Sequence, residues 1–186
     1  RRPTLISLNN DLVMLVADLR PSQAIVAVID LNGRLLAREV VPLASEPERG
    51  VGTMADCMKR MQMDHPGKTF EGVGISLPGR VNPATQRLIL SPNLKWSQYD
   101  IKGAVEKRIG LKVELSNAAN AALLSEMWFG RMDGVRNAVL ITISEGVGSA
   151  ILANGQIVAG KDGLAGEFGH IPIDPAGPLC GCGLKS

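Results

Sequence analysis

Short apolar runs that alternate with helical patterns constrain this chain more than any other feature of its sequence. Residues 12–18 and 24–30 are rich in Val, Ile and Leu, and their length fits strands. Residues 52–63 place methionines and Cys57 at helical spacing instead. Strands that alternate with helices predict an α/β fold with a mostly parallel core. The expected strands are 12–18, 24–30, 34–41, 73–77, 86–90, 112–115 and 138–143, and the expected helices are 52–63, 99–109 and 117–131.

A pattern that occurs twice within the sequence predicts two related lobes. Residues 24–36 and 149–158 each contain Asn-Gly between apolar runs, which is a strong hairpin signal. Each follows a strand and a turn, residues 18–22 in the first case and 144–148 in the second. Only 31 residues follow Gly155, too few for the helices that should cover a second sheet, so we expect the second lobe to be incomplete. The alternative is that two such hairpins arise by chance.

The charge balance gives no sign of a nucleic-acid surface. The 186 residues include 20 basic and 18 acidic ones, and no basic run is longer than Arg1-Arg2. Any DNA contact is therefore expected to lie outside this chain. No apolar run approaches the roughly 20 residues of a membrane span, and the first residues lack the apolar core of a signal peptide. We expect a cytoplasmic protein without a membrane partner.

Three cysteines form an odd set, which argues against a disulfide framework. Cys57 lies on the Met-rich helical face and is interpreted as a small core residue. Cys180 and Cys182 lie close together and are candidate metal ligands, with reduced thiols as the alternative.

The most specific motif is Gly163-Leu-Ala-Gly-Glu-Phe-Gly-His170, followed by Cys180-Gly-Cys182-Gly183. It resembles the signature of the ROK family, which contains repressors, sugar kinases and epimerase-kinases. Further matches occur in the family's order over the whole chain, at residues 74–79, 91–96, 117–121 and 145–148.

The resemblance implies an actin-like, ribonuclease-H-like α/β fold with two lobes. Residues 11–116 would form the first lobe, and residues 117–186 the start of a truncated second lobe. Residues 1–10 resemble the linker that follows an N-terminal winged helix-turn-helix domain in the family's transcriptional regulators. The regulator branch is therefore the expected one.

The resemblance also implies a sugar site made of Gly79, Asn93, Asn117, Glu167 and His170. A sugar presents a ring of hydroxyls, which amide, carboxylate and imidazole groups can orient by hydrogen bonds. Gly79 would let the backbone approach the ring closely. The alternatives are that Asn117 is a helix cap, Asn93 a turn residue and Glu167 a solvated charge.

His170, Cys180 and Cys182 resemble three of the four ligands of the family's structural zinc. Thiolates and imidazole suit tetrahedral Zn²⁺. One imidazole nitrogen could bind the metal and the other a sugar hydroxyl. Ser186 stands where the pattern has Gly, and the expected fourth ligand would follow it directly.

Two departures from the family's kinases predict a chain without kinase activity and without bound ATP. The kinases read Asn-Asp-x-Asn with the Asp as general base, and Ala118 stands at that position. Their first phosphate loop reads Asp-x-Gly-Gly-Thr, whereas residues 18–22 read Asp-Leu-Arg-Pro-Ser. Pro21 has no N–H, and the side chain of Arg20 obstructs the close approach that glycine allows. Only residues 145–148 keep glycines, which alone is a weak nucleotide signal.

We therefore expect a sugar-sensing effector domain of a transcriptional repressor or activator. Its effector would be a monosaccharide or sugar phosphate. A homodimer or higher homo-oligomer would pass the signal to DNA-binding helix-turn-helix domains. The alternatives are a divergent ATP-dependent sugar kinase and a sensor whose sugar site is vestigial.

Overall fold

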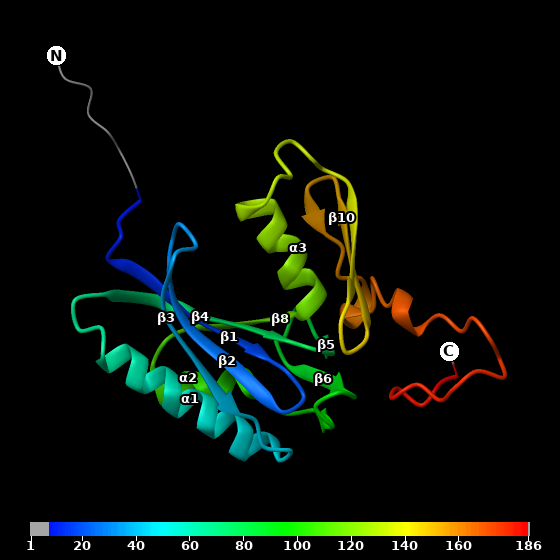
Figure 1. Cartoon of the computed structure of the whole chain (residues 1–186), viewed down its shortest axis with the longest axis horizontal. Coiled ribbons are helices and arrows are strands. Elements are labelled where there is room, and N and C mark those ends of the chain that lie inside the picture. The colour runs from blue at the N-terminus through cyan, green and yellow to red at the C-terminus, as the bar shows by residue number, and fades with distance from the viewer. Residues whose placement is uncertain (1–7, 186) are drawn as a thin grey trace.

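The computed structural model describes residues 8–185. Helix α3 (Ala118–Phe129) lies between the largest of three sheets and one of the two smaller ones (Figure 1). The largest sheet has five strands in the order β3-β2-β1-β4-β8. The pairs β1–β2 and β2–β3 are antiparallel, and β1–β4 and β4–β8 are parallel. The strands are β1 (Leu12–Leu19), β2 (Gln23–Asp30), β3 (Leu35–Pro42), β4 (Thr69–Leu77) and β8 (Val113–Asn117).

The expectation of a mostly parallel core is wrong for this sheet, because half of its strand pairs are antiparallel. Tight turns join β1 to β2 and β2 to β3, and a tight turn can only connect antiparallel neighbours. The hairpin predicted at Asn32-Gly33 is confirmed by the register of β2 and β3.

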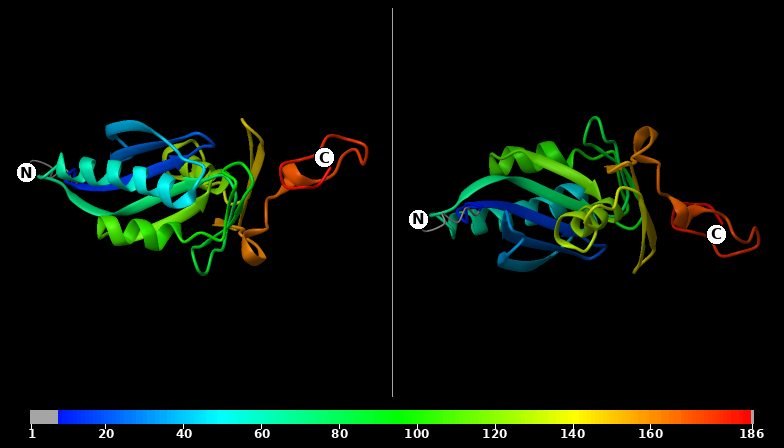
Figure 2. Two further views of the ribbon diagram at one scale, coloured as in Figure 1. Left: turned by 90° about the horizontal axis from the view of Figure 1, so that it is seen from below. Right: turned by 90° about the horizontal axis from the view of Figure 1, so that it is seen from above.

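Two helices, α1 (Pro47–Met63) and α2 (Ile101–Ile109), pack on each other and on one face of this sheet (Figure 2). Strand β1 turns Val13, Leu15, Ala17 and Leu19 toward them, and all four are buried. Cys57 is fully buried, which confirms its interpretation as a core residue.

Helix α1 begins at Pro47, five residues before the predicted start at residue 52. Proline suits the first helical position because its fixed φ is helical and its missing N–H would have no partner there. The apolar periodicity alone did not reveal this first turn.

A small antiparallel sheet follows the carboxyl end of β4. It contains β5 (Arg80–Val81), β6 (Leu88–Ser91) and β7 (Trp96–Ser97). Trp96 is fully buried, and its indole N–H donates to the carbonyl oxygen of Ser45 at 2.7 Å. This bond fixes the small sheet to the segment before α1.

The second lobe repeats the strand meander of the first. Strands β9 (Ala138–Ile143), β10 (Val147–Ala153) and β11 (Gln156–Ile157) form an antiparallel sheet. Asn154 and Gly155 turn β10 into β11 with positive φ angles of 53° and 81°, as the Asn-Gly pattern predicts. Two short 3-10 helices follow, η1 (Lys161–Gly163) and η2 (Phe168–His170).

Helix α3 (Ala118–Phe129) follows β8 directly and packs on the second sheet. Its buried residues Ala119 and Leu123 belong to one apolar cluster with Ala150 and Leu152 of β10. Most of the linker expected at residues 1–10, together with Ser186, lies outside the described residues. Within the part that is described, no helix is both long and apolar enough to span a membrane.

Candidate sugar and metal site

A pocket of about 770 Å³ lies where the two lobes meet. Its walls are the β1–β2 turn, the carboxyl end of β4, the β6–β7 turn, the first turns of α3, the β9–β10 turn and the loop around η2. Open α/β sheets place ligand sites at the carboxyl ends of their strands, and this pocket has that position. We call it the interlobe pocket. All five expected sugar-site residues line it, namely Gly79, Asn93, Asn117, Glu167 and His170.

Asn117 caps α3 and links it to the first lobe. Its side-chain oxygen accepts hydrogen bonds from the backbone N–H groups of Ala119, at 2.8 Å, and Asn120, at 3.4 Å. Its side-chain nitrogen donates to the carbonyl oxygen of Gly79 at 2.8 Å. Asn117 is therefore a helix cap, and its contact with a sugar stays a prediction. An amide nitrogen carries two hydrogens, so one N–H remains for a ligand in the pocket.

Gly79 owes its lack of a side chain to packing within the first lobe. Its φ is +130°, and an added Cβ would lie 2.5 Å from the carbonyl oxygen of Leu90 and 2.8 Å from Cα of Ser91. The close approach of β6 thus explains why residue 79 is glycine without any contact to a ligand. The sequence did not predict this packing.

Asn93 is exposed in the turn between β6 and β7. Lys95 N–H donates to the carbonyl oxygen of Pro92 at 3.1 Å and closes this turn. Asn93 is therefore a turn residue that lies at the pocket wall, and its contact with a sugar stays a prediction.

Glu167 and His170 come from the loop around η2, which is fixed on β10. Ser149 Oγ donates to the carbonyl oxygen of Gly166 and accepts from Phe168 N–H at 3.3 Å. Nε2 of His170 lies 3.5 Å from Oε2 of Glu167, and about a third of each side chain is exposed. Glu167 is thus half-buried against the imidazole.

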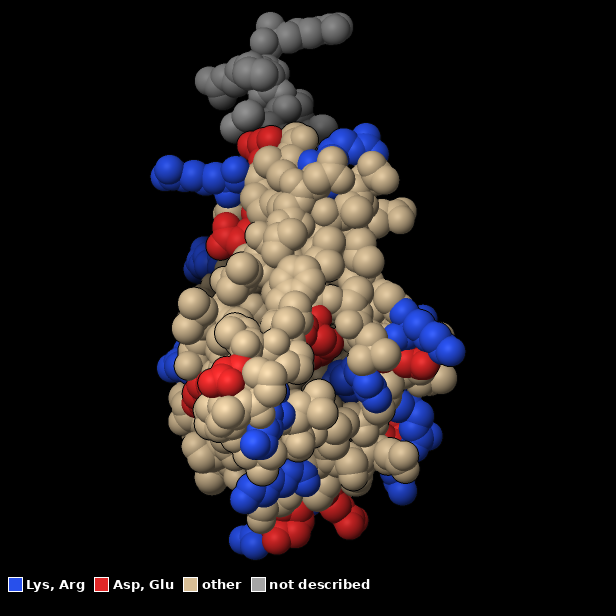
Figure 3. All heavy atoms as spheres, turned by 90° about the vertical axis from the view of Figure 1, so that its right-hand side faces the viewer, with Lys and Arg blue, Asp and Glu red and all other residues tan. Residues whose placement is uncertain are grey.

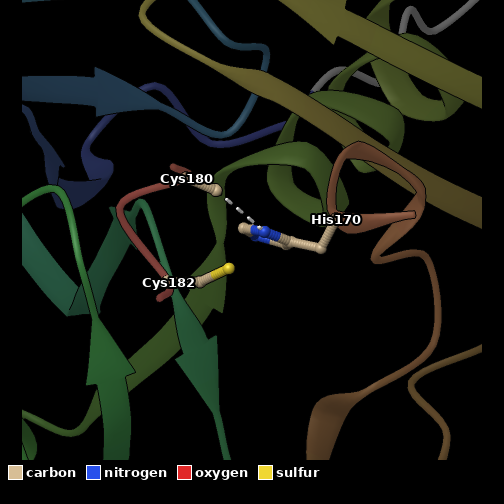
Figure 4. A group of neighbouring side chains, drawn as sticks. All are labelled: His170, Cys180 and Cys182. Carbon is tan, nitrogen blue, oxygen red and sulfur yellow. Dashed lines mark hydrogen bonds between the residues drawn. The ribbon is translucent and has the colours of Figure 1, made fainter. Parts of the chain in front are cut away.

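His170, Cys180 and Cys182 gather into one cluster, whose ligand atoms all lie within 4.8 Å of one another (Figure 4). Nδ1 of His170 is 3.6 Å from Sγ of Cys180. Typical Zn–S and Zn–N lengths in a tetrahedral site give about 3.6 Å between two such atoms, so this pair fits zinc.

The cysteine pair is shaped by a tight turn. Cys180 N–H donates to the carbonyl oxygen of Leu184 at 2.7 Å, and Gly183 N–H donates to that of Cys180 at 2.9 Å. A hydrogen bond from the backbone of Cys182, followed by one from its side chain, lowers the pKa of the Cys180 thiol. The thiolate is the form that binds metal. The cluster is consistent with the zinc motif that the sequence resembles.

The two turns expected at a nucleotide's phosphates face the same pocket. In the β1–β2 turn, Oδ2 of Asp18 accepts from Nε of Arg20 at 2.9 Å, and Oδ1 accepts from Ser76 Oγ at 3.2 Å. Ala118, at the position of the kinase base, also lines the pocket. A methyl group there can neither donate nor accept a proton.

Sequence reasoning missed part of the pocket wall. Ser76, Ser125 and Thr142 also line it. Ser125 lies seven residues after Ala118, which places both on one face of α3. The sequence shows this spacing, but the neighbouring alanines do not distinguish a ligand-facing side of the helix from a buried one.

Charged side chains of both signs mix on the face that carries the end of the chain (Figure 3). This agrees with the balanced composition. The prediction that any DNA contact lies outside this chain remains a prediction.

Comparison with known proteins identifies first the fold and then the family. A solved ROK family transcriptional regulator, described as a homologue of the E. coli MLC protein, superimposes with a TM-score of 0.83 at 27% identity, over 95% of this chain and 46% of that one. The fold is therefore the two-lobed α/β fold of the actin-like ATPases, as expected. The family model described as "ROK family" matches residues 18–186, and the chain belongs to the ROK family.

Kinases and repressors both occur among the similar proteins. Glucokinase of Streptomyces coelicolor is 36% identical over 168 residues, which is 90% of this chain and 52% of that protein. A putative xylose repressor of Caldicellulosiruptor sp. is 30% identical over 188 residues, 98% of this chain and 47% of that protein. The chain thus spans about half the length of these relatives, and its branch within the family stays a prediction.

Proposed function

We propose that this chain is the sugar-sensing domain of a ROK-family transcriptional regulator, which binds a sugar in the interlobe pocket without phosphorylating it. Ala118 carries this proposal. It lies in the pocket wall at the first residue of α3, where the family's kinases have the base that deprotonates the sugar hydroxyl. Loss of a general base typically slows a reaction about a hundred- to ten-thousand-fold.

The nucleotide side of the pocket supports the same proposal. Arg20 binds the carboxylate of Asp18, and Pro21 offers no N–H to a phosphate. A carboxylate that is already paired with a guanidinium is a poor ligand for the Mg²⁺ that accompanies ATP. Both halves of the phosphoryl-transfer machinery are therefore impaired.

The pocket retains groups that suit a sugar. Asn93, the remaining N–H of Asn117, Glu167 and His170 converge on it. When zinc is bound by His170, Cys180 and Cys182, it would hold the imidazole through Nδ1 and fix its orientation. We propose that sugar binding shifts the lobes and that a homodimer passes this change to attached helix-turn-helix domains.

A divergent sugar kinase is the second candidate, and the 36% identity to a glucokinase favours it. The deciding experiment uses the full-length protein and measures ADP release and calorimetric binding with glucose and xylose, the sugars in the relatives' names. Sugar binding without turnover supports the sensor. Turnover of about 1 s⁻¹ or more supports the kinase.

The same titrations test the site. Removing a buried polar partner typically costs about 1–3 kcal/mol, so Glu167→Ala should weaken sugar binding about five- to a hundred-and-fifty-fold. Absence of binding at millimolar sugar would favour a vestigial site instead.

A further inference from the structure

The charges in the interlobe pocket are not balanced. Three carboxylates line it, those of Asp18, Glu145 and Glu167, against the guanidinium of Arg20 and the imidazole of His170. Arg20 pairs with Asp18 at 2.9 Å, and Glu167 faces His170 at 3.5 Å. Glu145 takes part in none of the ion pairs found among the described residues. No basic side chain of the described residues therefore pairs with its negative charge at the β9–β10 turn.

Three backbone positions of the two facing turns offer no N–H group to an anion. Phosphates are held in proteins by free backbone N–H groups at turns and helix ends. Here Arg20 N–H donates to the carbonyl oxygen of Gln23 at 2.8 Å, and Ser144 N–H donates to that of Gly146 at 3.0 Å. Pro21 has no N–H to give. The N–H groups of Arg20 and Ser144 are thus already hydrogen-bonded within their own turns, and Pro21 has none.

From these two observations, and on the basis of the proposed sugar-binding function, we infer that Glu145 is a specificity-determining residue that restricts the pocket to sugars without a phosphate group. A phosphorylated sugar brings a charge of nearly −2 into a partly enclosed space. Glu145 is exposed at the edge of this space, so solvent partly screens its carboxylate, and the repulsion acts on a phosphate that lies close to it. An unphosphorylated sugar meets no such repulsion, and its hydroxyls can donate hydrogen bonds to the carboxylates.

The test compares glucose, xylose, glucose 6-phosphate and inorganic pyrophosphate by calorimetry on the full-length protein at constant ionic strength. Wild-type protein should bind glucose or xylose at least about ten-fold more tightly than glucose 6-phosphate. In Glu145→Gln, which removes the charge and keeps the shape, affinity for glucose 6-phosphate relative to glucose should rise about ten-fold, and pyrophosphate binding should appear or tighten.

Glu71→Gln is the matched control, because Glu71 is exposed at the start of β4 and does not line the pocket. It changes net charge equally and should leave both ratios unchanged. The inference is overturned if wild-type protein binds glucose 6-phosphate as tightly as glucose, or if Glu145→Gln behaves like Glu71→Gln. If no sugar binds at all, the proposed function fails. Pyrophosphate still tests Glu145 in that case, because tight binding to wild-type protein, or no gain in Glu145→Gln, contradicts the assignment.

Discussion

The side-chain amide of Asn117 donates to the carbonyl oxygen of Gly79 at 2.8 Å, while its oxygen caps the first turn of α3. One side chain thus joins the segment that leaves β4 to the helix that carries the second sheet. Gly79 and Asn117 lie 38 positions apart in the sequence, and both line the interlobe pocket. A movement of one lobe relative to the other therefore acts directly on the hydrogen bond between Asn117 and Gly79.

Asn117→Ala should lower the free energy of unfolding by about 2 kcal/mol, because it removes a helix cap and a further hydrogen bond. Urea unfolding measures the change. Asn117→Ser is the control, since its hydroxyl oxygen can still cap the helix and its shorter side chain loses only the donor to Gly79. It should cost less than Asn117→Ala. Equal losses in the two variants would show that the cap contributes nothing.

Gly79→Ala should destabilise the protein by about 2–4 kcal/mol. The new methyl group would lie 2.5 Å from the carbonyl oxygen of Leu90, and the φ of +130° is strained for alanine. Gly110→Ala is the matched control, because Gly110 ends α2 with a φ of +75° and nothing lies within 4 Å of its added Cβ. It should cost only about 1 kcal/mol. The packing account of Gly79 fails if the two variants unfold at the same urea concentration.

Much of this fold could be predicted because local patterns dominate it. The alternation along β1, the Asn-Gly turns and the periodicity of α1 and α2 each act within a few residues. The antiparallel share of the large sheet was underestimated, although the hairpin at Asn32-Gly33 already implied it.

The site was harder to read from the sequence. The family resemblance, and no pattern of spacing, singled out the five residues expected at a sugar and the three residues of the metal cluster. The pocket face of α3 could not be separated from its core face, because alanine occupies both. The pairing of Asp18 with Arg20 depends on side-chain geometry, and no sequence pattern reports it.

The full-length protein should carry one zinc ion per chain when it is purified without chelator, as elemental analysis would measure. Cys182→Ser should reduce the zinc content, because a serine hydroxyl is a much weaker zinc ligand than a thiolate. Cys57→Ala is the control and should retain the metal, since Cys57 is buried in the core of the first lobe. Zinc retention by Cys182→Ser would contradict the ligand assignment.

Thiol labelling should separate the three cysteines in metal-free protein. Burial, followed by the nearby carboxylate of Glu39, raises the pKa of Cys57 to about 11 from its ordinary 9.0. Cys57 should therefore stay unlabelled at pH 8 until denaturant is added, whereas Cys180 and Cys182 react. Between pH 9.0 and 11 the Cys57 thiol also stays protonated in the folded state, whereas it is ionised in the unfolded state. The free energy of unfolding should therefore fall as the pH rises from 9.0 toward 11, and titration of Cys57 should add no pH dependence below that range. Labelling of all three thiols in the native protein would contradict the buried position.

Ala118→Asp tests whether the missing base alone separates this chain from the family's kinases. The variant should fold, because an acidic side chain in the first turn of a helix interacts favourably with the helix dipole. It should still release ADP more slowly than about 0.01 s⁻¹ with glucose or xylose, well below ordinary enzyme turnover. The reason is that Arg20 keeps the Asp18 carboxylate paired and Pro21 cannot donate to a phosphate.

A variant that adds Arg20→Gly and Pro21→Gly to Ala118→Asp frees Asp18 and restores a backbone N–H at position 21. Any gain in turnover should therefore appear first in this triple variant. Turnover near 1 s⁻¹ in Ala118→Asp alone would show that the β1–β2 turn is competent for nucleotide binding, and the sensor proposal would then lose its second support.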